Sequence, residues 1–276
     1  MAMFLDPTID FAFKRVFGNQ AYPEITISLI NSLVKSIWET PVTKIEFLDT
    51  VNQPDTQELK YSIVDVRCTD QLKRQFIIEI QVRPQKFFSK RIQFYGAQAI
   101  TRQMKARDSF EAIVPVILIS ILDFDMIPHV EYINNYSLQH DVYHSRELDL
   151  VSYVFIELKK FNKKLSELQT IEEQWIYFIK YANELQSIPK ELAVNHEIEE
   201  AFELLKQGNL NESELATYDR AVDARRIDLD ALETAEARGE YKAKIEMAKK
   251  LLFDLQLSVE QVATATGLSV DELAKL

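Results

Sequence analysis

The sequence predicts an α/β fold: a central mixed sheet flanked by helices, with an α-helical C-terminal extension. Amphipathic helical patterns occupy residues 6–38, and β-rich runs surround one helical stretch between residues 44 and 158. The rest of the chain is helical in pattern and acidic. This order is typical of an α/β core with a helical appendage. We expect a core domain over residues 1–165, a helical extension over 166–235 and a C-terminal tail over 236–276.

The composition is that of a folded protein without membrane spans. Of the 276 residues, 47% are hydrophobic and 27% are charged, which suits one large domain or two small ones. No apolar run approaches the roughly 18 residues of a membrane span, and the N-terminus lacks the layout of a secretory signal. The one cysteine, Cys68, cannot form an internal disulfide, and its strand-like surroundings favour a buried thiol. We expect a soluble cytoplasmic protein.

Charge is distributed unevenly along the chain. The net charge is −11, yet residues 1–110 carry 15 Lys and Arg against 12 Asp and Glu, whereas residues 111–276 carry 17 against 31. Between Arg67 and Arg107 there are ten basic residues and two acidic ones. Such a local excess attracts a phosphate backbone even on an acidic protein. A solvated basic face explains the same charge pattern without any ligand.

Two helices are expected first. Asp6 as N-cap and Pro7 at the first helical position predict a helix that ends at Gly18. Its apolar residues fall on one face: Ile9, Phe13, Val16 and Phe17. A second amphipathic helix is expected from Glu24 to Trp38, before the next proline.

The segment KIEFLDTVN, residues 44–52, predicts a strand, followed by a polar segment, Gln53–Leu59. The runs YSIVDVRC (61–68) and QFIIEIQV (75–82) are rich in β-branched and aromatic residues. Because their connector TDQLKR is short and polar, they predict an antiparallel hairpin.

A helix with basic residues on its outer face is expected from Lys86 to Ala106. The apolar runs at residues 112–122 and 151–158 predict buried strands, and Pro115 predicts that the first begins late or lies at an edge of the sheet. Beyond Leu158 the pattern is helical, with one long helix from about Ser213 to Leu255.

The hairpin places polar residues where a buried strand normally holds apolar ones. If the turn covers residues 70–74, Asp65 lies opposite Glu79, and Gln81 shares the face of Glu79. Opposed like charges destabilise a sheet by up to ~1 kcal/mol. A divalent cation removes the conflict, because Mg²⁺ prefers hard oxygen ligands. The pair therefore predicts a metal site.

A second interpretation needs no metal. One face of the hairpin is then wet, with Gln81, Arg67 and Arg83 as ordinary exposed residues and Glu79 paired to Arg67. Spacing alone leaves both interpretations open.

Four segments in order carry a resemblance to a known family. They are DFAFKRVFG (10–18), the strand pair holding Asp65 and Glu79-Ile80-Gln81, FFSKRIQFYGAQ (87–98) and IELKKF (156–161). Together they resemble the Rpn family of recombination-promoting nucleases, or PD-(D/E)XK nuclease family transposases. The resemblance covers roughly residues 4–180 and implies a restriction-endonuclease-like core.

The resemblance implies a Mg²⁺-dependent DNA endonuclease linked to recombination or a mobile element, with Mn²⁺ as a substitute ion. By position, Asp65 and Glu79 are the expected metal ligands, with the backbone carbonyl of Ile80 as a third. By the same resemblance, Gln81 stands where the PD-(D/E)XK nuclease superfamily has a lysine. A glutamine holds a water by hydrogen bonds but brings no charge. The alternative is a catalytically weak or inactive relative that serves as a DNA- or protein-binding module.

Further residues are expected to assist. Asp10 is a candidate auxiliary ligand and Lys14 a candidate catalytic partner for phosphate or carboxylate; a plain exposed pair, worth ~0.3–0.5 kcal/mol, explains them equally. Arg91 and Tyr95 share a helical face and are expected to contact the scissile phosphate or support Glu79. The expected DNA-contacting residues are Arg67, Arg83, Lys86, Lys90, Arg91 and Tyr95.

Two other patterns are weaker indications of a functional site. His140 and His144 have the spacing of helical zinc ligands but lack a clear third ligand, which favours a surface loop. Residues 257–276 resemble a helix-turn-helix, although acidic residues open its second helix, so a packing or self-association role is favoured over DNA reading. We expect a homo-oligomer, formed through the C-terminal helices.

Overall fold

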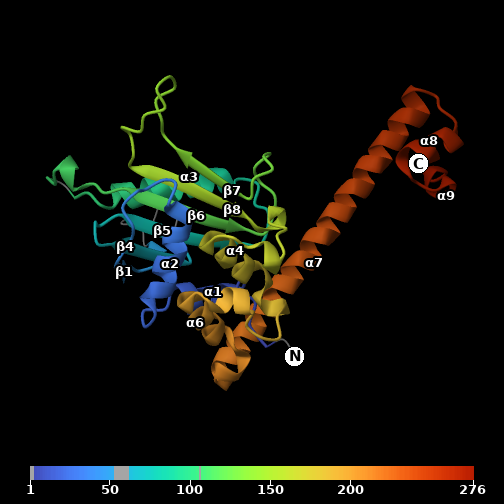
Figure 1. Ribbon diagram of the computed structural model, residues 1–276. Helices are drawn as coiled ribbons and strands as arrows, with labels where there is room; N and C mark the ends of the chain where they lie inside the picture. The colour runs from blue at the N-terminus through green and yellow to red at the C-terminus, as the bar shows by residue number, and fades with distance from the viewer. Residues whose placement is uncertain (1–2, 53–61, 106) are drawn as a thin grey trace. The chain divides into compact units, whose positions relative to one another are not determined.

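A mixed six-stranded sheet forms the centre of the protein (Figure 1). The computed structural model describes residues 3–52, 62–105 and 107–276. The three central strands, β5, β6 and β8, run parallel, and the outer ones pair antiparallel. In sheet order the strands are β1 (Ile45–Phe47), β4 (Val66–Asp70), β5 (Gln75–Gln81), β6 (Val116–Leu122), β8 (Val151–Glu157) and β7 (Ile133–Ser137). The predicted mixed sheet is confirmed.

The β4–β5 hairpin has the predicted register. Thr69 pairs with Gln75, and the ladder continues to Val66 opposite Ile78. Asp70 fixes the turn, because its Oδ1 accepts hydrogen bonds from the backbone N–H groups of Leu72 and Arg74, at 2.9 Å each. Since side chains alternate along a strand, this register decides which residues face which helix layer.

Helix α3 (Phe88–Thr101) covers one face of the sheet. Its buried side chains pack with those of the central strands in one cluster, which includes Phe88, Ile92, Tyr95, Ile77, Leu118 and Phe155. Gly96 permits the close approach, because a Cβ at this position would lie 3.1 Å from Leu118 Cδ1. The helix is therefore packed closely on β6 and β8, next to β5, the strand that carries Glu79.

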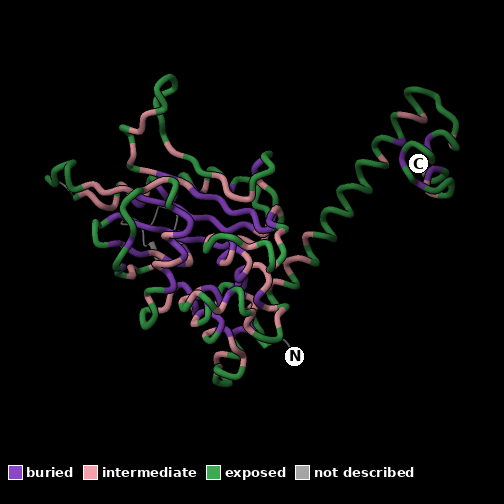
Figure 2. Tube along the Cα trace, viewed as in Figure 1, coloured by how far each residue is buried: buried purple, intermediate pink, exposed green. Residues whose placement is uncertain are grey.

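The opposite face is covered by the other helices of the core, with α2 and α4 in front of the sheet in Figure 1. These helices are α1 (Asp10–Phe17), α2 (Pro23–Val34), α4 (Ile171–Tyr181), the short α5 (Lys190–Ala193) and α6 (His196–Leu205). Edge-to-face aromatic contacts join three of them, with ring centroids 4.7 to 6.3 Å apart between Phe17, Trp175, Phe178 and Phe202. In Figure 2 the buried trace follows the strands and these helices.

The first two helices differ from the prediction at their ends. Helix α1 begins at Asp10 rather than at Pro7. Asp6 does not cap it, because Asp6 Oδ1 accepts hydrogen bonds from the N–H and the hydroxyl of Thr8 in a local turn. Gly18 ends it as predicted, whereas α2 ends four residues before Trp38, at Val34.

The strands also differ from the prediction. The expected strand at residues 44–52 is divided into β1 and β2 (Val51–Asn52), and β2 pairs with β3 (Ser62–Ile63). Of the two alternatives raised by Pro115, the late start is confirmed, because β6 begins at Val116 between two neighbours. Strand β7 was not predicted. The segment expected at Gln53–Leu59 lies outside the described residues.

The chain separates into two compact units, Met1–Ala221 and Val222–Leu276. Helix α7 (Glu212–Lys249) begins in the first unit and continues in the second, where a π-helical turn (Lys250–Asp254) and the helices α8 (Val259–Thr266) and α9 (Val270–Leu273) follow. Gly267 ends α8 in a left-handed conformation, with φ of 69°, which favours glycine. The predicted domain boundaries stay predictions. No described helix is both long and apolar enough to cross a bilayer.

The remaining regular segments are short 3₁₀ turns: Phe110–Ala112, Leu158–Lys160, Leu165–Glu167, Ala182–Glu184 and Gln207–Asn209.

Cys68 provides a test of the hairpin. Its side chain is fully buried in β4, and burial, with Asp70 nearby, raises the pKa of the thiol to about 12. Because the thiolate is the reactive form, a raised pKa keeps Cys68 protonated at pH 8. We expect no reaction of the native protein with Ellman's reagent at pH 8 and one reactive thiol after unfolding in guanidinium. Rapid labelling of the native protein would show that β4 is not buried as described.

Candidate active site

Asp65 lies in a bend directly before β4, one residue beyond the last ladder pair. Its Oδ2 accepts a hydrogen bond of 2.7 Å from the backbone N–H of Ile80. The register continues to Asp65 opposite Glu79, but the ladder itself stops at Val66 and Ile78, and the Asp65 side chain bonds to the next residue along β5. The reason is that β4 begins only at Val66, so the N–H of Ile80 has no ladder partner on the β4 side.

Helix α1 adds two charged groups to Asp65. Lys14 Nζ lies 2.8 Å from Asp10 Oδ1 and 3.7 Å from Asp65 Oδ1. Burial, together with a hydrogen bond to Asp10, raises the pKa of Asp65 to about 7. Two carboxyl groups thus share this position with one lysine. The arrangement is more than the plain exposed ion pair that the spacing of Asp10 and Lys14 allowed.

Glu79 lies in the middle of the sheet, with 3% of its surface exposed. Its Oε1 accepts hydrogen bonds from Arg91 Nη2 at 2.7 Å and from Gln81 Nε2 at 2.8 Å. Burial raises the pKa of Glu79, and the Arg91 guanidinium opposes that rise. The alternative in which Glu79 pairs with Arg67 is wrong, because Arg91 of α3 provides the counter-charge.

Arg91 is itself held in place on several sides. Its guanidinium carbon lies 5.0 Å from the ring centre of Phe88 and 5.8 Å from that of Tyr95. Nη1 donates to Gln85 Oε1, and Gln85 Nε2 donates to Gln81 Oε1 at 3.0 Å. The sequence did not indicate Gln85, because it lies in an irregular loop where no periodicity marks a residue.

Gln81 is engaged at both ends of its side-chain amide. The NH₂ group donates to Glu79 and the oxygen accepts from Gln85, while its backbone carbonyl accepts from the N–H of Asp123 at 2.9 Å. In this arrangement Gln81 orients Glu79. It adds no positive charge to the site.

The donor set fits a hard divalent cation. Glu79 Oε2 is buried and has no hydrogen-bond partner within the described residues, and the same holds for the hydroxyl of Ser120, its ladder neighbour on β6. The carbonyl of Ile80 points to the same side of β5 as its N–H, toward Asp65. No described cluster holds three or more His, Cys, Asp or Glu side chains at metal-binding distance. Backbone oxygen and water would therefore complete the coordination of an ion here.

The predicted DNA-contacting residues separate into two groups. Lys86 and Lys90 are exposed beside Arg91, at the start of α3. Arg67 lies elsewhere on the hairpin, where Nη2 donates to Gln75 Oε1 at 3.0 Å, and burial lowers its pKa. Arg83 is half-buried two residues beyond Gln81. The structure thus brings Lys86 and Lys90 to the site but not Arg67.

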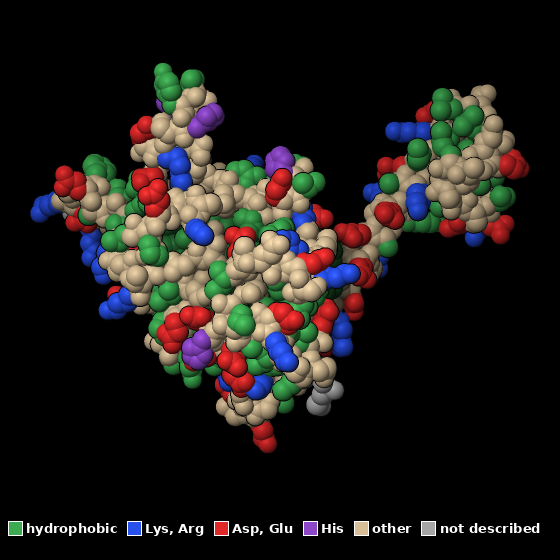
Figure 3. Space-filling view, in the orientation of Figure 1, with side chains coloured by type: hydrophobic (Ala, Val, Ile, Leu, Met, Phe, Trp, Pro, Cys, Tyr) green, Lys and Arg blue, Asp and Glu red, His purple; other side chains and the backbone are tan. Residues whose placement is uncertain are grey.

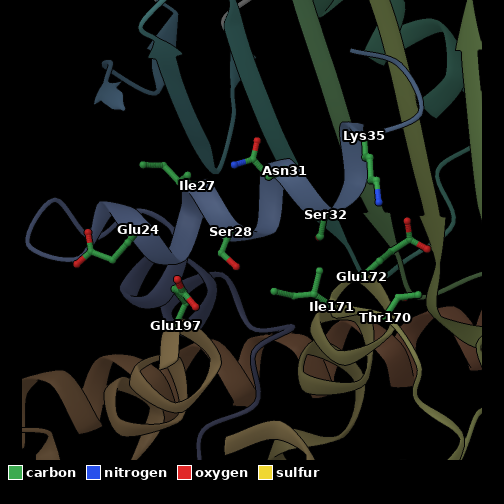
Figure 4. Close-up of a pocket in the computed structure, with 10 residues that line it drawn as sticks. All are labelled: Glu24, Ile27, Ser28, Asn31, Ser32, Lys35, Thr170, Ile171, Glu172 and Glu197. Carbon is green, nitrogen blue, oxygen red and sulfur yellow. The ribbon is translucent and has the colours of Figure 1, made fainter. Parts of the chain in front are cut away.

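A separate hollow of about 530 Å³ lies between α2 and the start of α4 and contains none of these residues (Figure 4). Its charged lining includes Glu24, Glu172 and Glu197 against Lys35, an excess of negative charge that disfavours phosphate. Acidic side chains also gather around α6 on the face shown in Figure 3. His140 and His144 are exposed, and within the described residues they belong to no metal-binding cluster.

Comparison with known proteins gives one match. A family model described as PD-(D/E)XK nuclease family transposase matches residues 7–235. This range includes Asp10, Lys14, Asp65, Glu79 and Gln81. Neither the curated proteins nor the solved structures contain a match.

The contact between Arg91 and Glu79 predicts a coupling in stability. Replacing Arg91 by Met leaves a buried carboxylate without its counter-charge, so we expect a loss of about 3 kcal/mol in the free energy of unfolding. In a Glu79→Gln background the same substitution should cost less than about 1 kcal/mol, because no buried charge remains. Urea unfolding followed by tryptophan fluorescence measures both values.

The control is Lys206→Met, which removes a partly exposed ion pair with Glu203 and should cost less than about 1 kcal/mol. An equal loss on replacing Arg91 in both backgrounds would contradict the assigned pairing.

Proposed function

Because the chain belongs to the PD-(D/E)XK nuclease family transposases, we propose that it is a Mg²⁺-dependent endonuclease that hydrolyses phosphodiester bonds of DNA. The observation that carries this proposal is the edge of β5 at Ile80. There Asp65 and the Ile80 backbone meet, and the neighbouring Glu79 holds a buried oxygen that has no hydrogen-bond partner among the described residues. Recombination, or movement of a mobile element, is the process in which we place the reaction.

Each residue has a role that its contacts support. Asp65, Glu79 and the Ile80 carbonyl would hold the ion, with Asp10 as an auxiliary ligand. A bound Mg²⁺, or Mn²⁺ in its place, polarises a phosphate oxygen and lowers the pKa of a coordinated water. Gln81 and Arg91 keep Glu79 in one orientation, since both donate to its Oε1.

Lys14 contributes positive charge on the Asp65 side, since its Nζ lies 3.7 Å from the Asp65 carboxylate. At that distance it offsets part of the negative charge that two carboxyl groups bring to a phosphate diester. Lys86 and Lys90 are proposed contacts for the DNA backbone, and Arg91 and Tyr95 border them. A break in both strands requires two such sites, which makes a homo-oligomer, assembled through the C-terminal helices, part of the proposal.

A specific observation favours a second candidate function. One N–H of the Gln81 amide donates to Glu79 and its oxygen accepts from Gln85, so the side chain brings no charge and only its second N–H to a water. This arrangement is compatible with a protein that keeps the nuclease fold and binds DNA or another protein without cutting. The two functions share the binding surface and differ in the chemistry at Glu79.

A plasmid assay separates the two functions. Purified full-length protein with Mg²⁺ is expected to convert supercoiled plasmid to nicked or linear DNA, and EDTA should stop the reaction. Asp65→Ala and Glu79→Ala should each lower the rate at least ~100-fold, because each removes a proposed ligand. Glu24→Ala is the matched control, since Glu24 lines the separate hollow, and it should leave the rate unchanged.

Binding of the ion is measured independently of cutting. Mn²⁺ should raise the melting temperature of the unaltered protein and of Glu24→Ala but not that of Asp65→Ala, because the ion stabilises only the state that binds it. Cutting that survives EDTA and both substitutions would overturn the enzyme proposal. DNA binding without any cutting would support the second candidate.

A further inference from the structure

Two large aromatic side chains are exposed beside the site. Phe87 and Phe94 have 60% and 42% of their surfaces exposed. Phe87 is the residue before α3, and Phe94 follows it by seven residues, so both lie on the same side of the helix. Arg91, which holds Glu79, lies between them in sequence.

Positive charge surrounds these rings. Lys86 Nζ and Lys90 Nζ lie 5.5 Å and 5.7 Å from the ring centre of Phe87. A hollow of about 630 Å³ is formed here, and none of its described lining residues is acidic: Gln85, Lys86, Phe87, Lys90, Arg91, Phe94 and Tyr95. On a protein with a net charge of −11, a basic hollow with aromatic walls is a local exception.

The basic residues and the exposed rings are suited to different parts of a nucleic acid. A lysine and arginine cluster alone suits any duplex, since phosphate contacts do not depend on base pairing. Exposed phenylalanine gains nothing from phosphate but stacks on the face of an unpaired base. Phe110 is more exposed, at 82%, yet among the described residues no lysine or arginine lies over its ring.

The distances suit a single strand. An α-helix rises about 1.5 Å per residue, so Phe87 and Phe94 are separated by about 10 Å along α3. Stacked nucleotides advance about 3.4 Å each along one strand. The two rings therefore match bases about three nucleotides apart, with Lys90 between them in sequence to meet a phosphate.

We propose that the DNA strand at this site has unpaired bases that stack on Phe87 and Phe94, while Lys86 and Lys90 contact its phosphates. The preferred substrate class is then single-stranded DNA or a locally opened duplex, such as a fork or a frayed end. In a closed duplex the base faces are covered by their neighbours, so these rings reach them only after opening. The proposal rests on the proposed function, since it places the opened strand next to Glu79.

The test compares three fluorescein-labelled DNAs of one sequence: a single strand, a closed duplex and a forked duplex. Fluorescence anisotropy with full-length protein in EDTA measures affinity without cutting. Phe87→Ala and Phe94→Ala should each weaken binding to the single strand and the fork at least about fivefold. Their effect on the closed duplex should be less than about twofold.

Control variants separate stacking from charge and from folding. Phe110→Ala should change none of the three affinities, and Phe87→Trp should keep single-strand binding because a ring remains. Lys90→Gln should weaken binding to all three DNAs and reduce the salt dependence of the affinity. A 2-aminopurine base in the single strand should be quenched on binding by the unaltered protein and less so by Phe87→Ala. Unchanged melting temperatures show that each variant folds.

Equal losses on single-stranded and closed duplex DNA, or no loss for either phenylalanine variant, would overturn the inference. Failure of the proposed function is distinguishable. If the protein cuts plasmid but the Phe87 and Phe94 substitutions do not change DNA affinity, the nuclease proposal stands and the stacking proposal fails. If both substitutions weaken single-strand binding but the protein does not cut plasmid, the stacking proposal stands and the proposed catalysis fails.

Discussion

The burial of one carboxylate, that of Glu79, is the constraint on which the site depends. A charged group in the middle of a sheet costs several kcal/mol unless partners compensate for the lost water. Arg91 and Gln81 compensate one of the two oxygens, and the other has no partner within the described residues. A fold selected for stability alone would place an apolar residue here. The proposed metal ion, which needs an oxygen ligand, would explain the exception.

The neighbouring elements are arranged around this constraint. Strand β4 begins only at Val66, which leaves the Ile80 edge of β5 open to the Asp65 carboxylate. Helix α3 is drawn close to the sheet at Gly96, and Arg91, which lies against the rings of Phe88 and Tyr95, reaches Glu79. On the other side α1 supplies Lys14. Three separate chain segments therefore converge on one edge of β5.

Local patterns were sufficient to predict the hairpin and its two carboxylates. The connector between β4 and β5 is short and the side-chain period is two, so the register followed from the sequence. The bond from the Ile80 N–H to the Asp65 side chain was not predicted; it forms because β4 begins only at Val66, one residue after Asp65. The start of α1 was misplaced, because Asp6 binds Thr8 locally instead of capping the helix.

Other features depend on tertiary contacts that no local pattern reports. Strand β7, with the sequence INNYS, carries little β signal and forms because it pairs with the edge of β8. Gln85 and Phe87 lie in the irregular segment before α3, and their significance depends on what the fold places beside them. The choice of Arg91 over Arg67 as the partner of Glu79 was likewise decided by the packing of α3.

The most direct measurement of the central claim is the anomalous scattering of Mn²⁺ in crystals of the full-length protein soaked with the ion. The account predicts a peak within coordination distance of Asp65, Glu79 Oε2 and the Ile80 carbonyl. In Glu79→Gln crystals soaked in the same way, the peak should be weakened or lost. A strong peak elsewhere, or none at this edge of β5, would contradict the account.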